Sequence, residues 1–395
     1  MGSHIVSNEN IEREQNSFTF VRMSLAVLVI FSHCYRLGGF DQEPLLTFSH
    51  NQSSFGSLAV DCFFIISGLF VVESFIASHS VWRYLWKRVL RIFPAYWVCL
   101  MTTAFVFGLI VYYFERGNFC YFQTVENNPL RYVGANWFLI IRQRGIANLF
   151  ATNPYSLDFN GSLWILKYQA LCYLSLVLIG FKSMPKYRRQ VFLGLFLFFW
   201  WANIFEANIK DIASAIAPEV QALGVPNVFV YFLAGSVFFL YVENIPLKRN
   251  LFICLVVAAV LGLRMGLHNV VGPVALPYIL LYLGKKLPLG KISKWGDYSY
   301  GIYIYAFPIQ QTLVFFGINR YGILGYFTLS VLITLPLAIM SWRLIEKPCL
   351  GLKALELKSL LSILPTRRKK ENGKLKPVLS VESTHGGKTE NKHYY

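Results

Sequence analysis

An arginine and a histidine share the first apolar stretch of the chain, and their spacing predicts that both lie on one helix face. Arg22 and His33 are eleven positions apart, which at 100° per residue is about 20° beyond three full turns. Ionisable side chains inside a bilayer are costly and usually face a cavity or a partner. We expect Arg22 to hold an anion near one membrane surface, and His33 to act as a base about 16.5 Å further along the axis. The non-functional alternative is that Arg22 reaches lipid headgroups and His33 bonds a neighbouring helix.

An aspartate follows early in the second apolar stretch, which would run antiparallel to the first. Asp61 lies near the end of this stretch that is predicted to face outward, at roughly the level of His33. A carboxylate there could fix the tautomer of the histidine and stabilise its protonated form. The alternative is a carboxylate that faces outer water. The next polar pair, Ser67 and Gly68, favours close packing between helices.

A cluster of basic residues precedes the third apolar stretch. Arg88 and Arg91 are three positions apart and share a helix face, with Lys87 beside them. The arginine guanidinium matches the oxygen geometry of phosphate. Together with Arg22 on the same membrane side, these residues could form a phosphate-binding mouth. The alternative is a set of anchors at the cytoplasmic membrane surface, since basic residues gather in cytoplasmic loops.

The fourth apolar stretch carries an amide and several aromatic residues. Gln169 lies about two turns into it. Trp164, Tyr168 and Tyr173 could stack on a sugar ring, or could belong to the aromatic belt at the membrane interface. The sequence does not decide between these two interpretations.

Composition indicates that lipid is the solvent for these residues. The chain has 395 residues, of which 55% are hydrophobic and only 14% charged, against about 25% charged in soluble domains. A bilayer core needs roughly 20 mostly apolar residues per helix. We predict an all-α membrane protein with about ten transmembrane helices, near 18–36, 56–77, 92–114, 161–181, 191–207, 225–243, 251–267, 270–284, 298–317 and 322–343.

The distribution of lysine and arginine predicts the orientation of these helices. Four short connections, at 78–91, 182–190, 244–250 and 285–297, hold fourteen of these residues, whereas the longer opposite side holds seven. Because basic residues favour cytoplasmic loops, both termini are expected in the cytoplasm. The net charge of +17 is therefore mostly a topology signal, and nucleic acid is not an expected partner.

Three parts of the chain follow from this pattern. Residues 1–16 are expected to form a cytoplasmic segment, and its first four residues look like a cloning remnant. Residues 17–350 are expected to form the membrane domain. Residues 351–395 form a basic tail that we expect to be disordered and to contact membrane lipids. The apolar run 137–141 is too short to span and predicts an interfacial or re-entrant piece. The seven cysteines are scattered, so we expect no metal site.

Six motifs, in order, resemble acyltransferase family 3, the membrane O-acyltransferases of the bacterial glycan O-acetyltransferase type. They cover residues 16 to 350 and comprise Arg22-x10-His33, Asp61-Cys62-Phe63-Phe64 with Ser67-Gly68, Lys87-Arg88-x-x-Arg91-Ile92-Phe93-Pro94, Asn160-Gly161-Ser162-Leu163-Trp164, Tyr298-Ser299-Tyr300-Gly301-Ile302-Tyr303 and Glu346-Lys347-Pro348.

The resemblance implies a multi-pass enzyme of the bacterial inner membrane. Such an enzyme moves an acetyl group from cytoplasmic acetyl-CoA to a hydroxyl of a cell-surface glycan or lipid-linked sugar. By carry-over, His33 is the catalytic histidine, and Asp61 and Gln169, which are expected to lie near it, are the other catalytic candidates. Arg22, Arg88, Arg91 and Lys87 are candidates for binding the acyl-CoA donor. The acceptor candidates are Trp164, Tyr168, Tyr173 and Asn160.

One position departs from the family pattern. The motif of the fourth helix reads Leu-Trp-x-x-x-Tyr-Glu in that family, whereas this chain has Gln169. Glutamine keeps the hydrogen-bonding reach of glutamate but cannot take up a proton. Either this branch does not need the carboxylate, or the chain is an inactivated variant. The rival functions are a transporter or flippase of a lipid-linked glycan or acyl donor, which would use the same charges as a pathway, and a membrane sensor without turnover.

Overall fold

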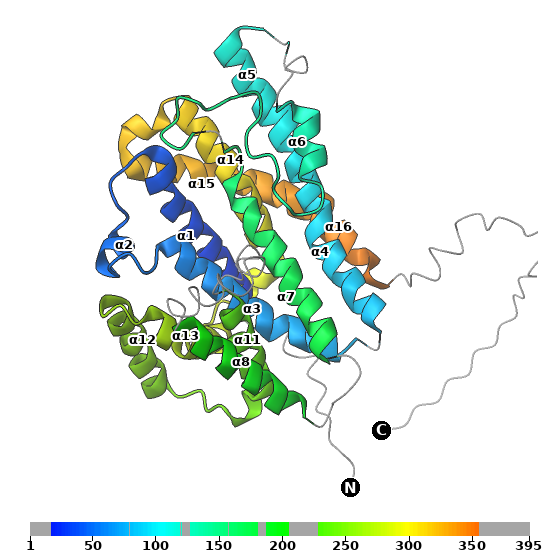
Figure 1. Cartoon of the computed structure of the whole chain (residues 1–395), viewed down its shortest axis with the longest axis vertical. Coiled ribbons are helices and arrows are strands. Elements are labelled where there is room, and N and C mark those ends of the chain that lie inside the picture. Colours follow the sequence, from blue (N-terminus) through cyan, green and yellow to red (C-terminus); the bar gives the residue numbers. More distant parts are fainter. Residues whose placement is uncertain are drawn as a thin grey trace, which may run out of the picture. The chain divides into compact units, whose positions relative to one another are not determined.

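The described part of the chain consists of helices joined by turns and loops (Figure 1). A computed structural model describes residues 17–78, 80–118, 120, 127–156, 158–180, 187–204 and 228–354. The predicted N-terminal segment 1–16, and the tail from 355 onward, lie outside the described residues. The first four tail positions, 351–354, end helix α16 (Lys347–Gly351) and form a short 3-10 turn.

Five helical segments are long and apolar enough to cross a membrane. They are α1 (Phe18–Gly38), α3 (Phe55–Ile76), Val81–Arg116, Gly161–Ile179 and Ile318–Gly351. Each coincides with one of the ten predicted stretches. This confirms the all-helical, multi-pass membrane class.

The other five predicted stretches are also helical over their described residues. They form α8 (Arg188–Ile204), α11 (Val228–Leu240), α12 (Arg249–Arg264), α13 (His268–Lys286) and α14 (Ser299–Phe315). Over the described residues, these helices are too short or not apolar enough to be identified as spans. The count of ten spans and the cytoplasmic position of both termini therefore stay predictions.

The longest helical segment begins earlier than the sequence predicts. Most of the predicted connection 78–91 is helix, because α4 runs from Val81 to Thr102. One π-helical turn (Thr103–Phe107) joins α4 to α5 (Gly108–Arg116). The basic cluster therefore lies on a rigid helix that continues into the apolar segment.

Where it is described, the predicted outer connection 115–160 is largely irregular. It contains the short helix α6 (Pro129–Ala135), and the apolar run 137–141 is not helical. Leu139 within that run has a φ of 65°, in the left-handed region. A further short helix, α2 (Pro44–Phe48), lies between α1 and α3.

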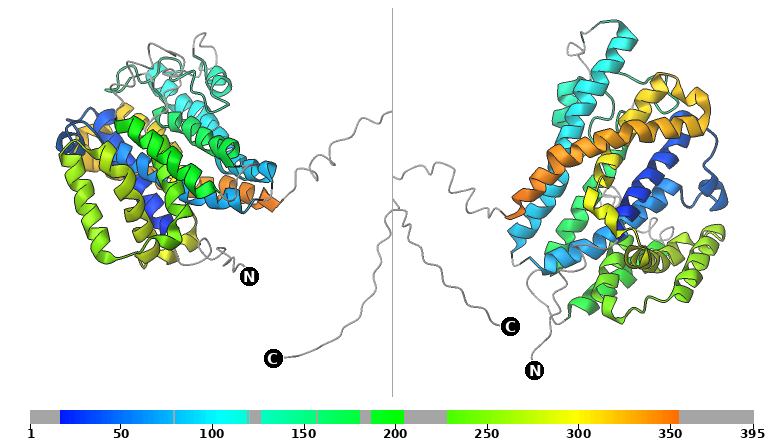
Figure 2. Two further views of the ribbon diagram at one scale, coloured as in Figure 1. Left: turned by 60° about the horizontal axis from the view of Figure 1, so that its bottom comes forward. Right: turned by 180° about the vertical axis from the view of Figure 1, so that it is seen from behind.

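Close contact between α3 and α11 organises the middle of the fold. A Cβ atom on Gly68 of α3 would fall on the backbone carbonyl of Phe232, and one on Gly235 of α11 would fall on the backbone of Ile65. Small residues let helix backbones approach in this way. The prediction that Ser67 and Gly68 mark a packing contact is thus confirmed for Gly68. Figure 1 and Figure 2 show α8, α11, α12 and α13 grouped together, with α4 and α7 (Trp164–Gly180) on the other side of α3.

Candidate functional site

A cavity of about 440 Å³ lies among α1, α3, α4, α7 and α14. Six of the eleven residues singled out from the sequence line it: Arg22, Lys87, Arg88, Arg91, Gln169 and Tyr173. The whole predicted donor set is therefore gathered in one place. Arg22 lies on α1, and the other three basic residues lie on the first three turns of α4. Because α4 begins at Val81, these turns belong to the same rigid helix as the apolar segment that follows.

A carboxylate that the sequence analysis missed holds two of these arginines. Asp297 lies just before α14, and its Oδ2 atom is 2.9 Å from Arg91 Nη2 and 3.4 Å from Arg22 Nη2. The hydroxyl of Ser299 donates to its other oxygen at 2.5 Å. Burial opposes ionisation of Asp297, but the nearby charges of Arg22 and Arg91 hold the pKa of this carboxyl below its usual value.

The signal for Asp297 was present in the sequence. It is the one acidic residue in the basic connection 285–297, whose lysines indicate the orientation of the helices. A second carboxylate, Glu346, lies 3.5 Å from Arg91 Nη1 and is almost fully buried. Arg91 thus lies between two carboxylates, and its net charge is compensated within the protein.

Arg88 has a different environment from Arg22 and Arg91. Its guanidinium donates to Ser74 Oγ at 3.0 Å and lies over the rings of Tyr84 and Tyr173. Within the described residues, no carboxylate pairs with it. Its Nε atom is buried and lacks a hydrogen-bond partner. A guanidinium that lines a cavity, with spare donors and uncompensated charge, is suited to bind an anion.

Position 169 lies beside the tyrosine that also lines the cavity. The Gln169 amide donates to the Tyr173 hydroxyl at 2.8 Å, and the Ser67 hydroxyl donates to the same oxygen at 3.2 Å. Both acceptor positions of that phenol are therefore used, which leaves its own O–H free to donate. Gln169 acts here as a positioning group for Tyr173.

His33 does not line this cavity. Its ring packs edge-to-face on Phe307 of α14, with the centroids 5.4 Å apart. Its Nδ1 atom is buried without a hydrogen-bond partner. The cavity ends on α14 at Tyr303, one turn before Phe307, where Tyr303 contacts the ring of Phe63.

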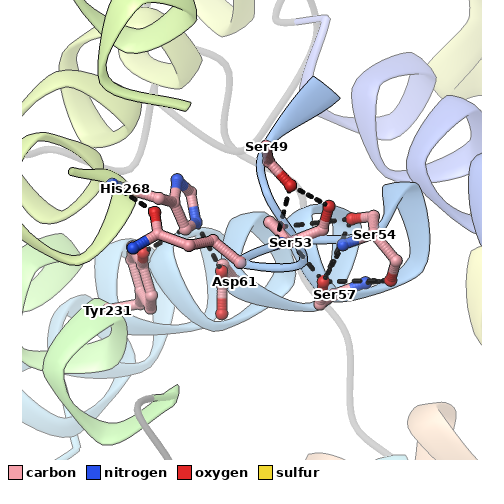
Figure 3. A network of polar contacts seen from close by, with 8 residues as sticks. Ser49, Ser53, Ser54, Ser57, Asp61, Tyr231 and His268 are labelled. Carbon is pink, nitrogen blue, oxygen red and sulfur yellow. Dashed lines mark hydrogen bonds and ion pairs between the residues drawn. The ribbon is translucent and has the colours of Figure 1, made fainter. Parts of the chain in front are cut away.

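The predicted pairing of Asp61 with His33 is wrong. Asp61 Oδ2 is instead 3.3 Å from Nε2 of His268, the first residue of α13, and the Tyr231 hydroxyl is 3.1 Å from the same nitrogen (Figure 3). Asp61 therefore faces α11 and α13 rather than α1. His268 was missed because the predicted eighth stretch begins at residue 270.

The predicted acceptor residues are not brought together. Asn160 is buried, and its amide donates to the carbonyl of Ile304 at 2.9 Å, so it fastens the start of α7 to α14. Trp164 is exposed and contacts the ring of Tyr168, and neither lines the cavity. Of this set, only Tyr173 lies in the cavity.

The chain is similar to known proteins over most of its length. A family model described as an acyltransferase domain matches residues 15–343. The chain is 28% identical over 357 residues to an O-acetyl transferase of Shigella phage Sf6, a match that covers 85% of this chain and 96% of that protein. It is 26% identical over 383 residues to nodulation protein 10 of Rhizobium leguminosarum bv. viciae, covering 88% and 96%. No solved structure matches. The chain therefore belongs to acyltransferase family 3 and is an acyltransferase.

Proposed function

We propose that this enzyme transfers an acetyl group from cytoplasmic acetyl-CoA to a hydroxyl of a cell-surface glycan, such as lipopolysaccharide O-antigen or exopolysaccharide, in the bacterial inner membrane. The observation that carries the proposal is the cavity in which Arg22, Lys87, Arg88 and Arg91 meet. The name of the phage relative, an O-acetyl transferase, supports acetyl as the acyl group.

The basic side of the cavity suits the phosphates of CoA. Arg88 provides the uncompensated guanidinium, and Lys87, which donates to Ser78 at 3.3 Å, lies next to it on α4. Arg22 and Arg91 are held in place by Asp297. The volume of about 440 Å³ is within the range of pockets that hold small molecules. The pantetheine arm would then extend along α1, where the rise from Arg22 to His33 is about 16.5 Å.

His33 is the base of the proposed reaction. It removes the proton of the acceptor hydroxyl as the oxygen attacks the thioester carbonyl. The C–S bond breaks, an ester forms, and the proton passes to the CoA thiolate. In a two-step variant the acetyl group first resides on the imidazole. The phenol of Tyr173 lines the donor cavity and donates to the bound donor.

The role of position 169 bears on whether the chain is active with glutamine there. A glutamine there cannot exchange a proton, but it holds Tyr173 through the hydrogen bond from its amide. We propose that the position acts by placing Tyr173. On this account the parent chain transfers acetyl groups, because its amide donates to Tyr173 and leaves the phenol proton free, whereas a required carboxylate at this position would leave only the Gln169→Glu variant active.

The test is transfer of radiolabel from acetyl-CoA to cell-envelope glycan by the purified protein reconstituted in vesicles, with and without Gln169→Glu. We expect label in the glycan with the parent chain. A transporter or flippase would instead move lipid-linked glycan across the vesicle membrane without acyl-CoA. Absence of label with both forms, together with such movement, would contradict the proposal.

A further inference from the structure

Four polar or aromatic side chains gather near the ring of Phe307, outside the donor cavity. His33 packs on this ring at 5.4 Å between centroids, and Tyr155 packs on it at 6.0 Å. The guanidinium of Arg36 lies 4.5 Å from the ring of Tyr155. Asp158 completes the group, which we call the Phe307 cluster (His33, Arg36, Tyr155 and Asp158).

A glycine allows the carboxylate of Asp158 to approach Phe307. A Cβ atom on Gly161 would lie 2.9 Å from Asp158 Oδ2 and 2.8 Å from Phe307 Cζ. The carboxylate and the ring therefore both border the space beside Gly161, where any larger residue would collide with both. Asp158 is therefore brought to the same ring that supports His33.

Two atoms of the Phe307 cluster are buried without a hydrogen-bond partner. They are Oδ1 of Asp158, a residue that is only 4% exposed, and Nδ1 of His33. The other carboxylate oxygen of Asp158 is bound by Arg144 Nη1 at 3.2 Å. Buried polar atoms without partners are rare in native proteins, because each one has lost its water without compensation. A ligand that supplies the missing partners would remove this cost.

The segment that carries Asp158 is held rigidly. The side-chain amide of Gln311 on α14 donates to the carbonyls of Tyr155 at 2.7 Å and Asp158 at 2.9 Å. The unpartnered carboxylate oxygen is therefore fixed in position. Preorganisation of this kind favours binding, because the protein loses little conformational entropy when the ligand binds.

The chemistry of the two free atoms selects the ligand. A carboxylate oxygen accepts hydrogen bonds, and an imidazole nitrogen accepts one when the proton is on Nε2. Both atoms therefore call for a hydrogen-bond donor such as a hydroxyl, which a fully ionised phosphate does not supply. We propose that the Phe307 cluster binds the acceptor as a polyol, with one hydroxyl donating to Asp158 Oδ1 and the reacting hydroxyl donating to His33 Nδ1. This assignment rests on the function proposed above.

The test compares Asp158→Ala with a matched control, Arg142→Ala, in the full-length protein. Arg142 is an exposed basic residue in the same loop. The acceptor probes are methyl glucoside, methyl mannoside and methyl rhamnoside, with acetyl-CoA at saturation. We expect Asp158→Ala to raise the KM of the preferred glycoside about tenfold or more, as for loss of a hydrogen bond to a charged group. Asp158→Asn, which keeps an acceptor oxygen, restores part of the loss. The Kd of CoA is unchanged, and Arg142→Ala behaves as the parent.

A second measurement separates this inference from the proposed function. The glycosides are also added to the proteins without acetyl-CoA, and thermal stabilisation is measured. If the parent transfers no acetyl group, the proposed function fails. The inference still stands if a glycoside stabilises the parent and not Asp158→Ala. It is overturned if no glycoside stabilises the parent, or if Asp158→Ala keeps the parental KM and stabilisation.

Discussion

The three arginines of the donor cavity differ in how much of their charge is available to a ligand. Arg91 is compensated by Asp297 and Glu346, and Arg22 by Asp297. Arg88 contacts a serine hydroxyl and two aromatic rings instead. The first two therefore shape the wall of the cavity, while Arg88 provides the main attraction for an anion.

Replacement of Arg88 by alanine is expected to weaken CoA binding strongly. A charge-assisted hydrogen bond contributes about 1.5–3 kcal/mol, so the Kd should rise about tenfold or more. Arg83→Ala is the matched control, because Arg83 is an exposed residue of the same helix that does not line the cavity. Titration calorimetry measures both, and an equal CoA affinity for the parent and Arg88→Ala would remove this residue from the donor site.

Replacement of Asp297 by asparagine is expected to lower stability. It leaves Arg22 and Arg91 without their shared carboxylate, and since both arginines are about a quarter exposed, we expect a loss of about 1–2 kcal/mol. The folded-state pKa of Asp297 lies below its usual value. Its stabilisation is therefore complete above the ordinary carboxyl range of about pH 4 and is lost as the pH falls through the folded-state pKa.

Thermal unfolding of the parent and of Asp297→Asn, measured across pH, checks this prediction. The difference in Tm should be largest at neutral pH and should shrink below about pH 4. A difference that stays constant down to acid pH would show that the carboxylate charge is not the cause.

Residue types and spacing predicted that the basic residues lie together, but they did not predict the carboxylates that pair with them. The basic residues could be grouped because they share a helix face and one side of the membrane. The pairing of Asp61 with His33 failed because α3 is apolar on all sides, so its sequence does not show which face meets which neighbour. Asp158 was not predicted either, because it lies in an irregular loop whose sequence has no helical periodicity.

At the scale of elements, close packing between α3 and α11 sets the position of the cavity wall. The wall includes Phe63, Ser67 and Phe70 of α3, while the opposite face of that helix packs on α11 through Gly68 and Gly235. The helices themselves were predictable from hydropathy. The early start of α4 was not, because its first turns carry the basic residues that resemble a loop.

A methyl group on Gly68 should therefore destabilise the protein. It would collide with the backbone of Phe232, which cannot move as a flexible side chain would. Overpacking of this kind costs about 1–3 kcal/mol. Gly194→Ala on α8 is the control, since a Cβ atom there meets no neighbouring atom within 4 Å. Tm values in detergent compare the two variants, and equal stability would contradict the packing account.

At the scale of the whole molecule, the proposed reaction requires the donor and the acceptor to enter from opposite sides of the membrane. Lys291 lies in the predicted cytoplasmic connection 285–297, and Arg320 lies on the predicted outer side. Both residues are exposed. Their positions report the orientation directly.

Single cysteines at these positions test the orientation, after the native exposed cysteines Cys120 and Cys254 are replaced by serine. A membrane-impermeant maleimide should label Lys291→Cys only in inverted vesicles and Arg320→Cys only in intact spheroplasts. Labelling of both from the same side would refute the predicted topology.

The most direct test of the account is single-turnover acetyl transfer by the parent and by His33→Ala, with the Kd of CoA measured on the same samples. His33 lies outside the donor cavity, so CoA affinity should stay within about twofold, while the loss of a general base should slow transfer about 10²- to 10⁴-fold. Transfer by His33→Ala at the parental rate, with CoA still bound, would contradict the claim that His33 performs the chemistry.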